Sequence, residues 1–338
     1  MISLNHSLLH YNTFGIKAEA SSFAILEQEN QLPQIIEQAA GQPIFVLGGG
    51  SNIVFKEKIK GLVLLNKLQH ISIEKTLHDE VIISVGAGVN WHQLVLWSLK
   101  QGFGGLENLA LIPGTVGAAP IQNIGAYGVE LKDVFESLEA YNLQTGKRQF
   151  FSYTDCQFSY RNSFFKQKKI EGKFCLSKIF LRLSINHHRI NKDYGGIRQT
   201  LHSWSITNPI PSDIAAAVIN IRRNKLPDWQ KLGNAGSFFK NPITTKKTQE
   251  QLLEKHPTLP SYPMKNGMVK LAAGWLIDQC GWKGKREKNV GCYEKQALVI
   301  VNYGGATSHE ILSFSDQIIR SVHDEFGISL EREVRLIG

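Results

Sequence analysis

The chain has 338 residues, of which 42% are hydrophobic and 20% are charged, with 30 Gly and 11 Pro. This composition excludes disorder, collagen and coiled coil as the main architecture, and the length favours two or three domains over one. Lys and Arg outnumber Asp and Glu by 38 to 29, giving a formal net charge of +9. Such an excess suits nucleic acid, a membrane surface or an anionic small substrate, or has no functional meaning.

The basic residues help to choose among these partners. Their densest groups are 166–169, 222–225 and 283–288, three local patches rather than one long basic face. None is interleaved with an aromatic RNA-binding motif. We therefore expect no nucleic-acid partner and favour an anionic small molecule.

Cysteine spacing and hydropathy indicate the redox state of the thiols, whether they bind metal, and where in the cell the protein works. Cys156, Cys175, Cys280 and Cys292 form neither a C-x-x-C pair nor a zinc spacing, so we expect reduced thiols and no metal. The first twelve residues lack a secretion signal, and no run approaches the ~18 apolar residues of a membrane span. The sequence predicts a cytoplasmic protein without a membrane partner.

The N-terminal elements predict a mixed α and β unit. Strand 81–85 leads through glycines into helix 90–101, for which Asn90 is the expected N-cap and Gly102 follows the end. Before it the pattern predicts a helix at 31–40, strands at 43–47, 53–55 and 61–66, and a loop at 48–52.

Residues 103–128 are rich in glycine and apolar side chains without a clear period. That composition is awkward for a solvent-exposed loop and natural for backbone that lies against a ligand. Strand-like stretches follow at 137–143 and 173–183.

A second, helix-rich region begins near Pro211, where Ser212 is the expected cap of a helix. Further helices are predicted at 248–255 and 270–280. The clearest helix begins at a capping box from Thr307 to Glu310 and ends at Gly327. Residues 328–337 alternate as a strand that places Glu331, Glu333 and Arg335 on one face.

The loop from Gly48 to Asn52 lies between two strand-like runs, where its amides could hold a phosphate. It matches neither G-x-G-x-x-G nor a P-loop, so a tight turn is the simpler interpretation of this loop alone. The second glycine-rich segment, from Leu106 to Gly128, changes that balance. Two such segments favour a long dinucleotide held along its length.

Six strings, spaced along nearly the whole chain, carry a more specific signal. They begin at Asn12, Leu47, Ile112, Tyr160, Gly233 and Lys270, and include IPGTVGAAPIQNIGAYG and GNAGSFFKNP. In these strings the sequence resembles the UDP-N-acetylenolpyruvoylglucosamine reductases (MurB, UDP-N-acetylmuramate dehydrogenases). The resemblance implies an FAD enzyme that uses NADPH to reduce the enolpyruvyl ether of UDP-N-acetylglucosamine to UDP-N-acetylmuramate, in cytoplasmic peptidoglycan precursor synthesis.

The resemblance also implies an α+β fold of the vanillyl-alcohol oxidase/PCMH type for FAD, with an added α+β substrate-binding domain. That agrees with the missing Rossmann fingerprint. We expect FAD-binding subdomain 1 at 1–68 plus 327–338, FAD-binding subdomain 2 at 69–221, and the substrate-binding domain at 222–326.

Three catalytic roles follow from the resemblance. Arg161 would bind the substrate carboxylate, because a planar guanidinium pairs bidentately with such a group. Ser237 would donate a proton to the second carbon of the vinyl ether. Glu333 is the third catalytic residue, and a carboxyl there helps only in a protonated form. The alternatives are a surface ion pair for Arg161, a cap or turn for Ser237, and an edge-strand carboxylate paired with Arg335 for Glu333.

Binding residues follow from the resemblance in the same way. Those for the substrate, each with the alternative of a solvated surface residue, are Tyr160, Tyr194, Lys225, Asn241, Lys283 and Gln296. Those for FAD are Gly48, Gly49, Gly50, Ser51, Asn52, Pro113, Gly114, Thr115, Gly117, Ala118, Pro120, Asn123, Gly125, Ala126 and Arg335.

Two other functions compete with this one. A flavoprotein oxidase of the same fold would act on an alcohol or sugar with oxygen, but the strings around Arg161 and Ser237 disfavour it. A nucleotide-binding or basic nucleic-acid-binding protein would leave the glycine-rich segments unexplained. We expect a monomer that binds a UDP-sugar.

Overall fold

In a computed structural model of the chain, the structure describes residues 2–194, 196–264 and 267–338. They form two compact units. Unit 1 comprises the described residues of Met1–His6, Ala20–Gly50 and Ile59–Asn224, and unit 2 comprises Ser7–Glu19, Ser51–Lys58 and the described residues of Lys225–Gly338. The finer division into three domains stays a prediction.

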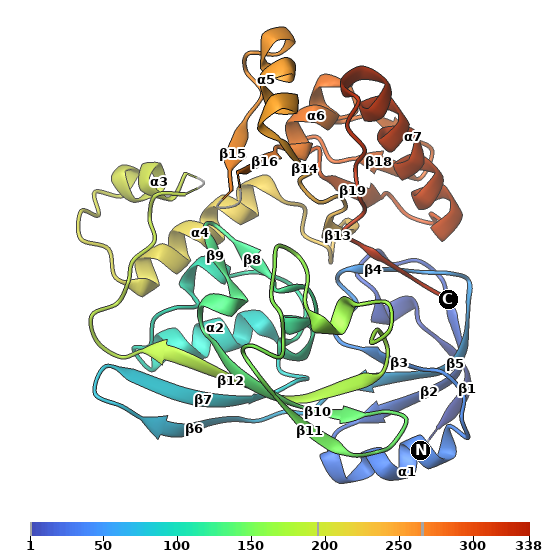
Figure 1. Ribbon diagram of the computed structural model, residues 1–338. Helices are drawn as coiled ribbons and strands as arrows, with labels where there is room; N and C mark the ends of the chain where they lie inside the picture. The colour runs from blue at the N-terminus through green and yellow to red at the C-terminus, as the bar shows by residue number, and fades with distance from the viewer. Residues whose placement is uncertain (1, 195, 265–266) are drawn as a thin grey trace. The chain divides into compact units, whose positions relative to one another are not determined.

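A five-stranded antiparallel sheet is the largest element of unit 1 (Figure 1). Its central strand β12 is almost strictly alternating in burial, as expected of a strand with one face on a core. In spatial order the strands are β11 (Arg148–Ser152), β10 (Phe135–Asn142), β12 (Phe174–Ser184), β7 (Glu80–Gly86) and β6 (Ile71–Thr76).

Helix α2 (Trp91–Lys100) packs on this sheet, with Leu94 and Val95 in the same core as Ile83 and Leu138. Its start and end agree with the sequence prediction, because the Asn90 side chain accepts the Gln93 N–H and Gly102 follows in a left-handed conformation. Helices α3 (Ile197–Ser203) and α4 (Pro211–Lys225) come later.

The expected cap of α4 is wrong. Ser212 lies inside the helix, and the carboxylate of Asp213 instead accepts the N–H of Ile210 at 2.9 Å. Asp is as good a cap-forming side chain as Ser, so composition alone did not choose between neighbours. The buried face of α4 includes Ile214 and Val218, as the spacing predicts.

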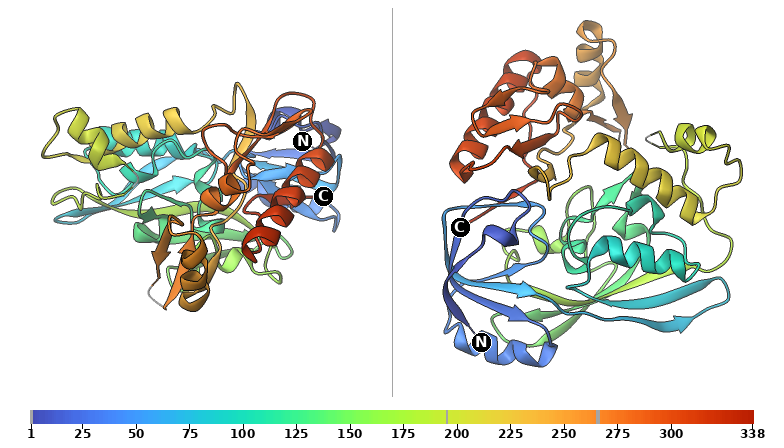
Figure 2. Two further views of the ribbon diagram at one scale, coloured as in Figure 1. Left: turned by 90° about the horizontal axis from the view of Figure 1, so that it is seen from above. Right: turned by 180° about the vertical axis from the view of Figure 1, so that it is seen from behind.

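A second sheet of unit 1 has the order β1–β2–β5–β3, and α1 (Leu32–Gln38) lies beside it (Figure 2). Leu32 and Ile35 of this helix share a core with Leu62 and Leu64. The strands of this sheet are β1 (Ser3–Ser7), β2 (Glu19–Leu26), β5 (Lys58–Asn66) and β3 (Ile44–Leu47). Elsewhere in unit 1, β8 (Gly125–Ala126) and β9 (Val129–Glu130) form a separate short hairpin.

Unit 2 contains three small sheets and three helices. One sheet is β13 (Gly233–Ser237), β19 (Val299–Asn302), β18 (Val290–Cys292) and β17 (Arg286–Glu287); another is β14 (Ile243–Thr245), β16 (Met268–Leu271) and β15 (Ser261–Pro263). The third pairs β4 (Ile53–Phe55) with β20 (Arg335–Ile337) in parallel. The helices are α5 (Lys246–Lys255), α6 (Ala273–Gln279) and α7 (Ser308–Phe326).

The predicted bounds hold for α7 and fail for α6. Thr307 and Glu310 form the expected capping box, and Gly327 ends α7 in a left-handed conformation. Helix α6 is shorter than predicted because Lys270 pairs with strands on both sides of β16. At the C-terminus the expected strand is regular only in β20, where Leu336 is 46% exposed.

Candidate active site

The two glycine-rich loops lie backbone against backbone in unit 1. A Cβ at Gly48 would lie 2.5 Å from Thr115 Oγ1, and a Cβ at Gly49 would lie 2.7 Å from the Cα of Gly114. Neither separation is sterically possible, so only glycine allows this approach. The sequence predicted both loops for the same cofactor, and the structure brings Gly48 and Gly49 against Gly114 and Thr115.

The rest of the second loop folds as two short 3-10 turns, Val116–Ala118 and Pro120–Gln122, followed by β8. Among its predicted cofactor residues, Asn123 is fully buried in a left-handed conformation. Its Nδ2 donates to Glu130 Oε2 and to the carbonyl of Ser159, each at 3.1 Å. Asn123 therefore ties this loop to the turn that carries Tyr160 and Arg161.

Arg161 lies against the same loop. Its Nη2 donates to the carbonyl of Gly125 at 2.6 Å, and its guanidinium lies 5.3 Å from the Tyr160 ring centroid. The backbone of Arg161 has φ of +53°, and Lys166 Nζ donates to its carbonyl at 3.1 Å. A non-glycine residue in this region is uncommon and costs conformational energy, which tertiary contacts must offset. The sequence-predicted arginine thus stands beside the predicted cofactor segment.

Sequence reasoning missed Arg222 and Tyr127 as members of this site. The Arg222 guanidinium interacts with the Tyr127 side chain, and burial lowers the pKa of Arg222. Its Nε is buried without a hydrogen-bond partner among the described residues. The Tyr127 ring also meets the ring of Tyr194 edge to face, 6.4 Å between centroids. By sequence, Arg222 is placed only in the basic patch 222–225. The two residues are far apart in the chain, so no sequence motif indicates that Arg222 lies near Tyr127.

Asn108 is a third residue that the sequence did not single out. It is 1% exposed, and its Nδ2 donates to the carbonyl of Tyr127 at 3.0 Å and of Asn191 at 2.9 Å. Asn191 in turn donates to the carbonyl of Gly128 at 3.3 Å. These bonds hold the segment before Tyr194 to the end of the second glycine-rich loop.

His92 supports the entrance to that loop. Its Nδ1 accepts the N–H of Leu111 at 3.0 Å, and Leu111 has a left-handed φ of +60°. Burial, with Arg223 and Arg222 nearby, lowers the pKa of His92. The neutral ring is the form that can accept this bond, because a protonated imidazole has only donors.

In unit 2, Ser237 follows an irregularity in β13. The register with β19 shifts between Asn234 and Ser237, Gly236 has φ of +68°, and Asn234 Oδ1 accepts the Gly236 N–H at 3.0 Å. Bulges re-aim side chains and are common next to active sites. Here Ser237 is exposed while the next residue, Phe238, is 1% exposed.

The string that begins at Asn12 supports this same turn. Thr13 Oγ1 donates to the carbonyl of Asn234 at 2.6 Å. A Cβ at Gly233 would lie 2.3 Å from the carbonyl oxygen of Phe14, so the two segments are in direct backbone contact. The sequence alone assigns no role to this string, and in the structure it supports the Ser237 segment.

Glu333 stands in register with the Ser237 segment. Its N–H donates to the carbonyl of Phe238 at 2.8 Å. Asn52 Nδ2 donates to the carbonyl of Glu333 at 3.3 Å, and the N–H of Arg335 donates to the Asn52 carbonyl at 3.1 Å. Thus the predicted residues Ser51, Asn52, Ser237, Glu333 and Arg335 belong to unit 2, whereas Gly48, Gly49, Gly50 and Arg161 belong to unit 1.

Three of the predicted substrate residues already have partners within unit 2. Asn241 Oδ1 accepts the N–H of Ala273 at 3.0 Å, at the start of α6. Lys283 Nζ lies 3.1 Å from Asp278 Oδ2, and Gln296 Oε1 accepts the N–H of Leu298 at 3.3 Å. Lys225 is the exposed last residue of α4.

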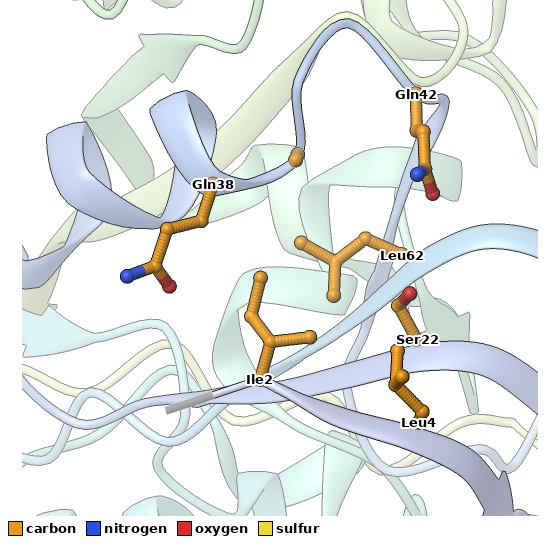
Figure 3. Close-up of a pocket in the computed structure, with 7 residues that line it drawn as sticks. Ile2, Leu4, Ser22, Gln38, Gln42 and Leu62 are labelled. Atoms are coloured by element: carbon orange, nitrogen blue, oxygen red, sulfur yellow. The ribbon is translucent and has the colours of Figure 1, made fainter.

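A cavity of about 500 Å³ in unit 1 does not belong to this site (Figure 3). It lies between β1 and α1 and contains none of the predicted residues. Its lining has no charged side chain, so it does not suit a pyrophosphate. The lining residues are Ile2, Leu4, Ser22, Gln38, Ala39, Gln42 and Leu62.

The cysteines and carboxylates suggest no further reactive centre. All four cysteines are free, and burial raises the pKa of Cys156, Cys175 and Cys292 to about 12. Within residues 2–194, 196–264 and 267–338, no group of three or more His, Cys, Asp or Glu side chains could hold a metal ion. In the same ranges no helix has the length and apolar character needed to cross a bilayer.

Two family models match the chain. One, described as an FAD binding domain, covers residues 20–151; the other, described as the C-terminal domain of UDP-N-acetylenolpyruvoylglucosamine reductase, covers residues 228–337. The first contains both glycine-rich loops, and the second contains Ser237 and Glu333.

Relatives of full length carry the same name. The UDP-N-acetylenolpyruvoylglucosamine reductase of Flavobacterium johnsoniae is 44% identical over 336 residues, 99% of each chain. That of Pseudomonas aeruginosa is 45% identical over 332 residues, 98% of this chain and 97% of its own. The crystal structure of the Thermus caldophilus enzyme matches with a TM-score of 0.66 at 24% identity, over 100% of this chain and 98% of that one.

These matches confirm the expected α+β fold, with an FAD-binding domain followed by the C-terminal domain of the reductases. With more than 40% identity over the whole length of its relatives, the chain belongs to the UDP-N-acetylenolpyruvoylglucosamine reductase family.

Proposed function

We propose that this chain uses NADPH to reduce the enolpyruvyl ether of UDP-N-acetylglucosamine to UDP-N-acetylmuramate, a step of peptidoglycan precursor synthesis. The observation that carries the proposal is the full-length identity with the reductases, together with a matched FAD-binding domain. The enzyme is an FAD-dependent oxidoreductase. We place it in the cytoplasm, where its nucleotide substrates are made.

The residues of unit 1 fit FAD. Closely opposed glycine-rich backbones offer amides to a pyrophosphate, and the Arg222 guanidinium, whose Nε is buried, suits an electron-rich or anionic group. Bound there, FAD supplies hydride chemistry that no side chain performs, taking hydride from NADPH and delivering it to the vinyl ether. We assign Gly48 to Asn52 to the pyrophosphate and the loop from Pro113 to Ala126 to the remainder of the cofactor.

Arg161 is proposed to bind the substrate carboxylate. When hydride adds to the terminal carbon of the vinyl ether, negative charge spreads onto that carboxylate. A guanidinium fixed before the reaction stabilises the charge as it develops, without reorganisation of solvent. The bond from Arg161 to the Gly125 carbonyl and the contact with Tyr160 supply that fixation.

Ser237 is proposed to donate a proton to the second carbon. An isolated serine is a poor acid, but a positioned hydroxyl transfers its proton when a neighbour or water replaces it. The irregular turn at Gly236 leaves Ser237 exposed next to the buried Phe238. This exposure is compatible with the role, since the hydroxyl must reach a ligand.

Glu333 is proposed to act next to Ser237 as a carboxylic acid. An ionised carboxylate would repel the charge that develops on the substrate, whereas a protonated carboxyl can donate a hydrogen bond to it. The backbone bond between Glu333 and Phe238 supports a shared location for the two side chains.

Tyr194 and Lys225 are proposed to contact the substrate diphosphate, since phenol and ammonium groups suit its charge. Asn241, Lys283 and Gln296 are weaker candidates, because Asn241 and Gln296 each accept a main-chain N–H and Lys283 pairs with Asp278. Tyr160 is proposed to contact the substrate beside Arg161.

The visible spectrum of the purified holoenzyme tests this function. Under anaerobic conditions NADPH should bleach the flavin band, and the enolpyruvyl UDP-sugar should restore it. A band that only oxygen restores would support an oxidase of the same fold. A protein that stays colourless after reconstitution with FAD would instead support a nucleotide- or nucleic-acid-binding protein.

Steady-state kinetics test a second consequence. Both NADPH and the UDP-sugar must bring a carbon to the same reactive position, so we propose that they bind in turn. Initial-rate plots should then show parallel lines as the second substrate is varied. Intersecting lines would contradict alternating occupancy.

A further inference from the structure

We propose that Arg332 is a positioning residue that fixes Glu333 in register opposite Phe238, the residue after Ser237, by anchoring the C-terminal segment to helix α7. The inference rests on the proposed roles of Ser237 and Glu333. It concerns a side chain that neither the sequence nor the family resemblance singled out.

The C-terminal segment 331–333 pairs antiparallel with 238–240, outside the regular strands. The N–H of Lys240 donates to the carbonyl of Glu331 at 2.9 Å, and the N–H of Glu333 donates to the carbonyl of Phe238 at 2.8 Å. Between them Arg332 faces Phe239 as an isolated bridge. Two hydrogen bonds and one bridge form a short ladder, and a slip of one residue would turn every side chain to the other face.

Arg332 attaches this ladder to α7 through three acceptors on one side of the helix. Its Nε donates to Ser315 Oγ at 2.8 Å, and its Nη2 donates to Asp316 Oδ1 and, at 3.5 Å, to the carbonyl of Leu312. Ser315 is fully buried, and its own hydroxyl donates to Leu312 at 2.7 Å. The planar fork of arginine is therefore held in one orientation.

The anchor determines which way the neighbouring side chain points. In an extended segment successive side chains project to opposite faces, so a side chain of Arg332 directed to α7 directs Glu333 away from it. The ion pair itself is half exposed at Asp316 and contributes little to global stability. Its effect is local, on the register of the residue that follows.

The other ion pair of this ladder does not provide the same restraint. Lys240 Nζ pairs with Glu331, whose side chain is 72% exposed. It joins the two paired segments to each other, and neither of its members bonds to a helix. The side-chain bonds of Arg332, in contrast, reach helix α7.

Variants of the Arg332 contacts test the proposal in the holoenzyme. R332M keeps the apolar stem and removes all three hydrogen bonds, R332K keeps the charge without the fork, and D316N removes only the ion-pair charge. R332M should slow reoxidation by the enolpyruvyl UDP-sugar by about tenfold to a hundredfold, and leave flavin reduction by NADPH within about twofold. R332K and D316N should fall between R332M and wild type.

Hydrogen exchange provides a readout independent of activity. In R332M, a peptide spanning 328–338 should exchange faster by about tenfold, while a peptide within 317–326 of α7 should be unchanged. The matched control is E250Q, which breaks the exposed Lys246–Glu250 ion pair on α5. It should alter neither half-reaction nor the exchange of 328–338.

Equal slowing of both half-reactions, or faster exchange in both peptides, would overturn the proposal in favour of a general structural role. Wild-type rates and exchange in R332M would overturn it outright. If R332M does not fold, D316N decides by the same criteria. If the wild-type enzyme does not react with the UDP-sugar, the proposed function fails, and the exchange of 328–338 still decides whether Arg332 sets the register.

Discussion

The N–H of Glu333 donates a 2.8 Å hydrogen bond to the carbonyl oxygen of Phe238, the residue that follows Ser237. This bond brings a residue from the C-terminal end of the chain to the exposed hydroxyl after the β13 irregularity. Strand-like pairing of this kind fixes the spacing of two side chains more tightly than a flexible loop does. The predictions that follow begin at this pair.

Replacing Ser237 with Ala should separate the two half-reactions. Flavin reduction by NADPH should stay near the wild-type rate, because no proton is required from Ser237 there. Reoxidation by the UDP-sugar should fall by about 10²- to 10⁴-fold, the usual range for loss of a general acid. Anaerobic stopped-flow absorbance measures both steps.

The matched control for this variant is S329A, which alters an exposed serine in the same unit. Its two half-reactions should equal those of the wild type. Similar losses in both half-reactions of S237A would remove Ser237 from the role of proton donor.

Replacing Arg161 with Lys should show whether the fork or the charge matters. Lys keeps the charge but cannot pair bidentately. The reoxidation rate should drop by about 10²-fold, as for loss of one fixed donor at a developing anion. R148K, at an exposed ion pair with Glu139, serves as the control and should be unaffected. Full activity in R161K would favour a structural role for this arginine.

Replacing Gly49 with Ala should weaken FAD binding. The new methyl would lie 2.7 Å from the Cα of Gly114, so one of the loops must move. Overpacking of this kind costs about 1–3 kcal/mol, and if it acts on the binding conformation FAD affinity falls by about tenfold to a hundredfold. Fluorescence quenching of FAD by the apoprotein measures the dissociation constant.

Gly146 provides the comparison, because a Cβ there meets nothing within 4 Å although its φ is +67°. G146A should cost about 1 kcal/mol of stability from backbone strain and leave FAD affinity unchanged. Equal FAD affinities for G49A and wild type would show that the contact between the loops is not part of the cofactor site.

His92 should make the stability of unit 1 sensitive to acid. Burial lowers its pKa in the folded chain below the ordinary value of 6.5. As the pH falls below 6.5 the unfolded chain takes up a proton that the folded chain does not, so the free energy of unfolding decreases until the folded pKa is reached. Above pH 6.5 this contribution to stability is fully present.

The variant H92Q cannot titrate and keeps an oxygen that can accept the Leu111 N–H. Between about pH 7.5 and pH 5.5 it should lose less stability than the wild type, as measured by urea unfolding. H202Q, at an exposed histidine, should follow the wild-type curve. Parallel pH curves for H92Q and wild type would refute the assignment to His92.

The sequence predicted elements well where their signals are local. Asn90 and Gly102 delimit α2, and Thr307, Glu310 and Gly327 delimit α7, because capping depends on side chains within a few residues of the helix end. The sequence wrongly predicted that Lys270 begins a helix, whereas Lys270 belongs to β16. Pairing with two other strands decided that position, and no local preference reports such pairing.

The candidate site likewise combines residues that the sequence predicted with contacts that only the structure reveals. The strings carried the resemblance to the family, and that resemblance implied the cofactor and the candidates Arg161, Ser237 and Glu333. They did not reveal that Arg222 reaches Tyr127, that Asn108 joins Tyr127 to Asn191, or that Arg332 is attached to α7. Those contacts join residues far apart in the chain, and only the tertiary structure decides them, since a hydrogen bond depends on distance in space rather than on order in the sequence.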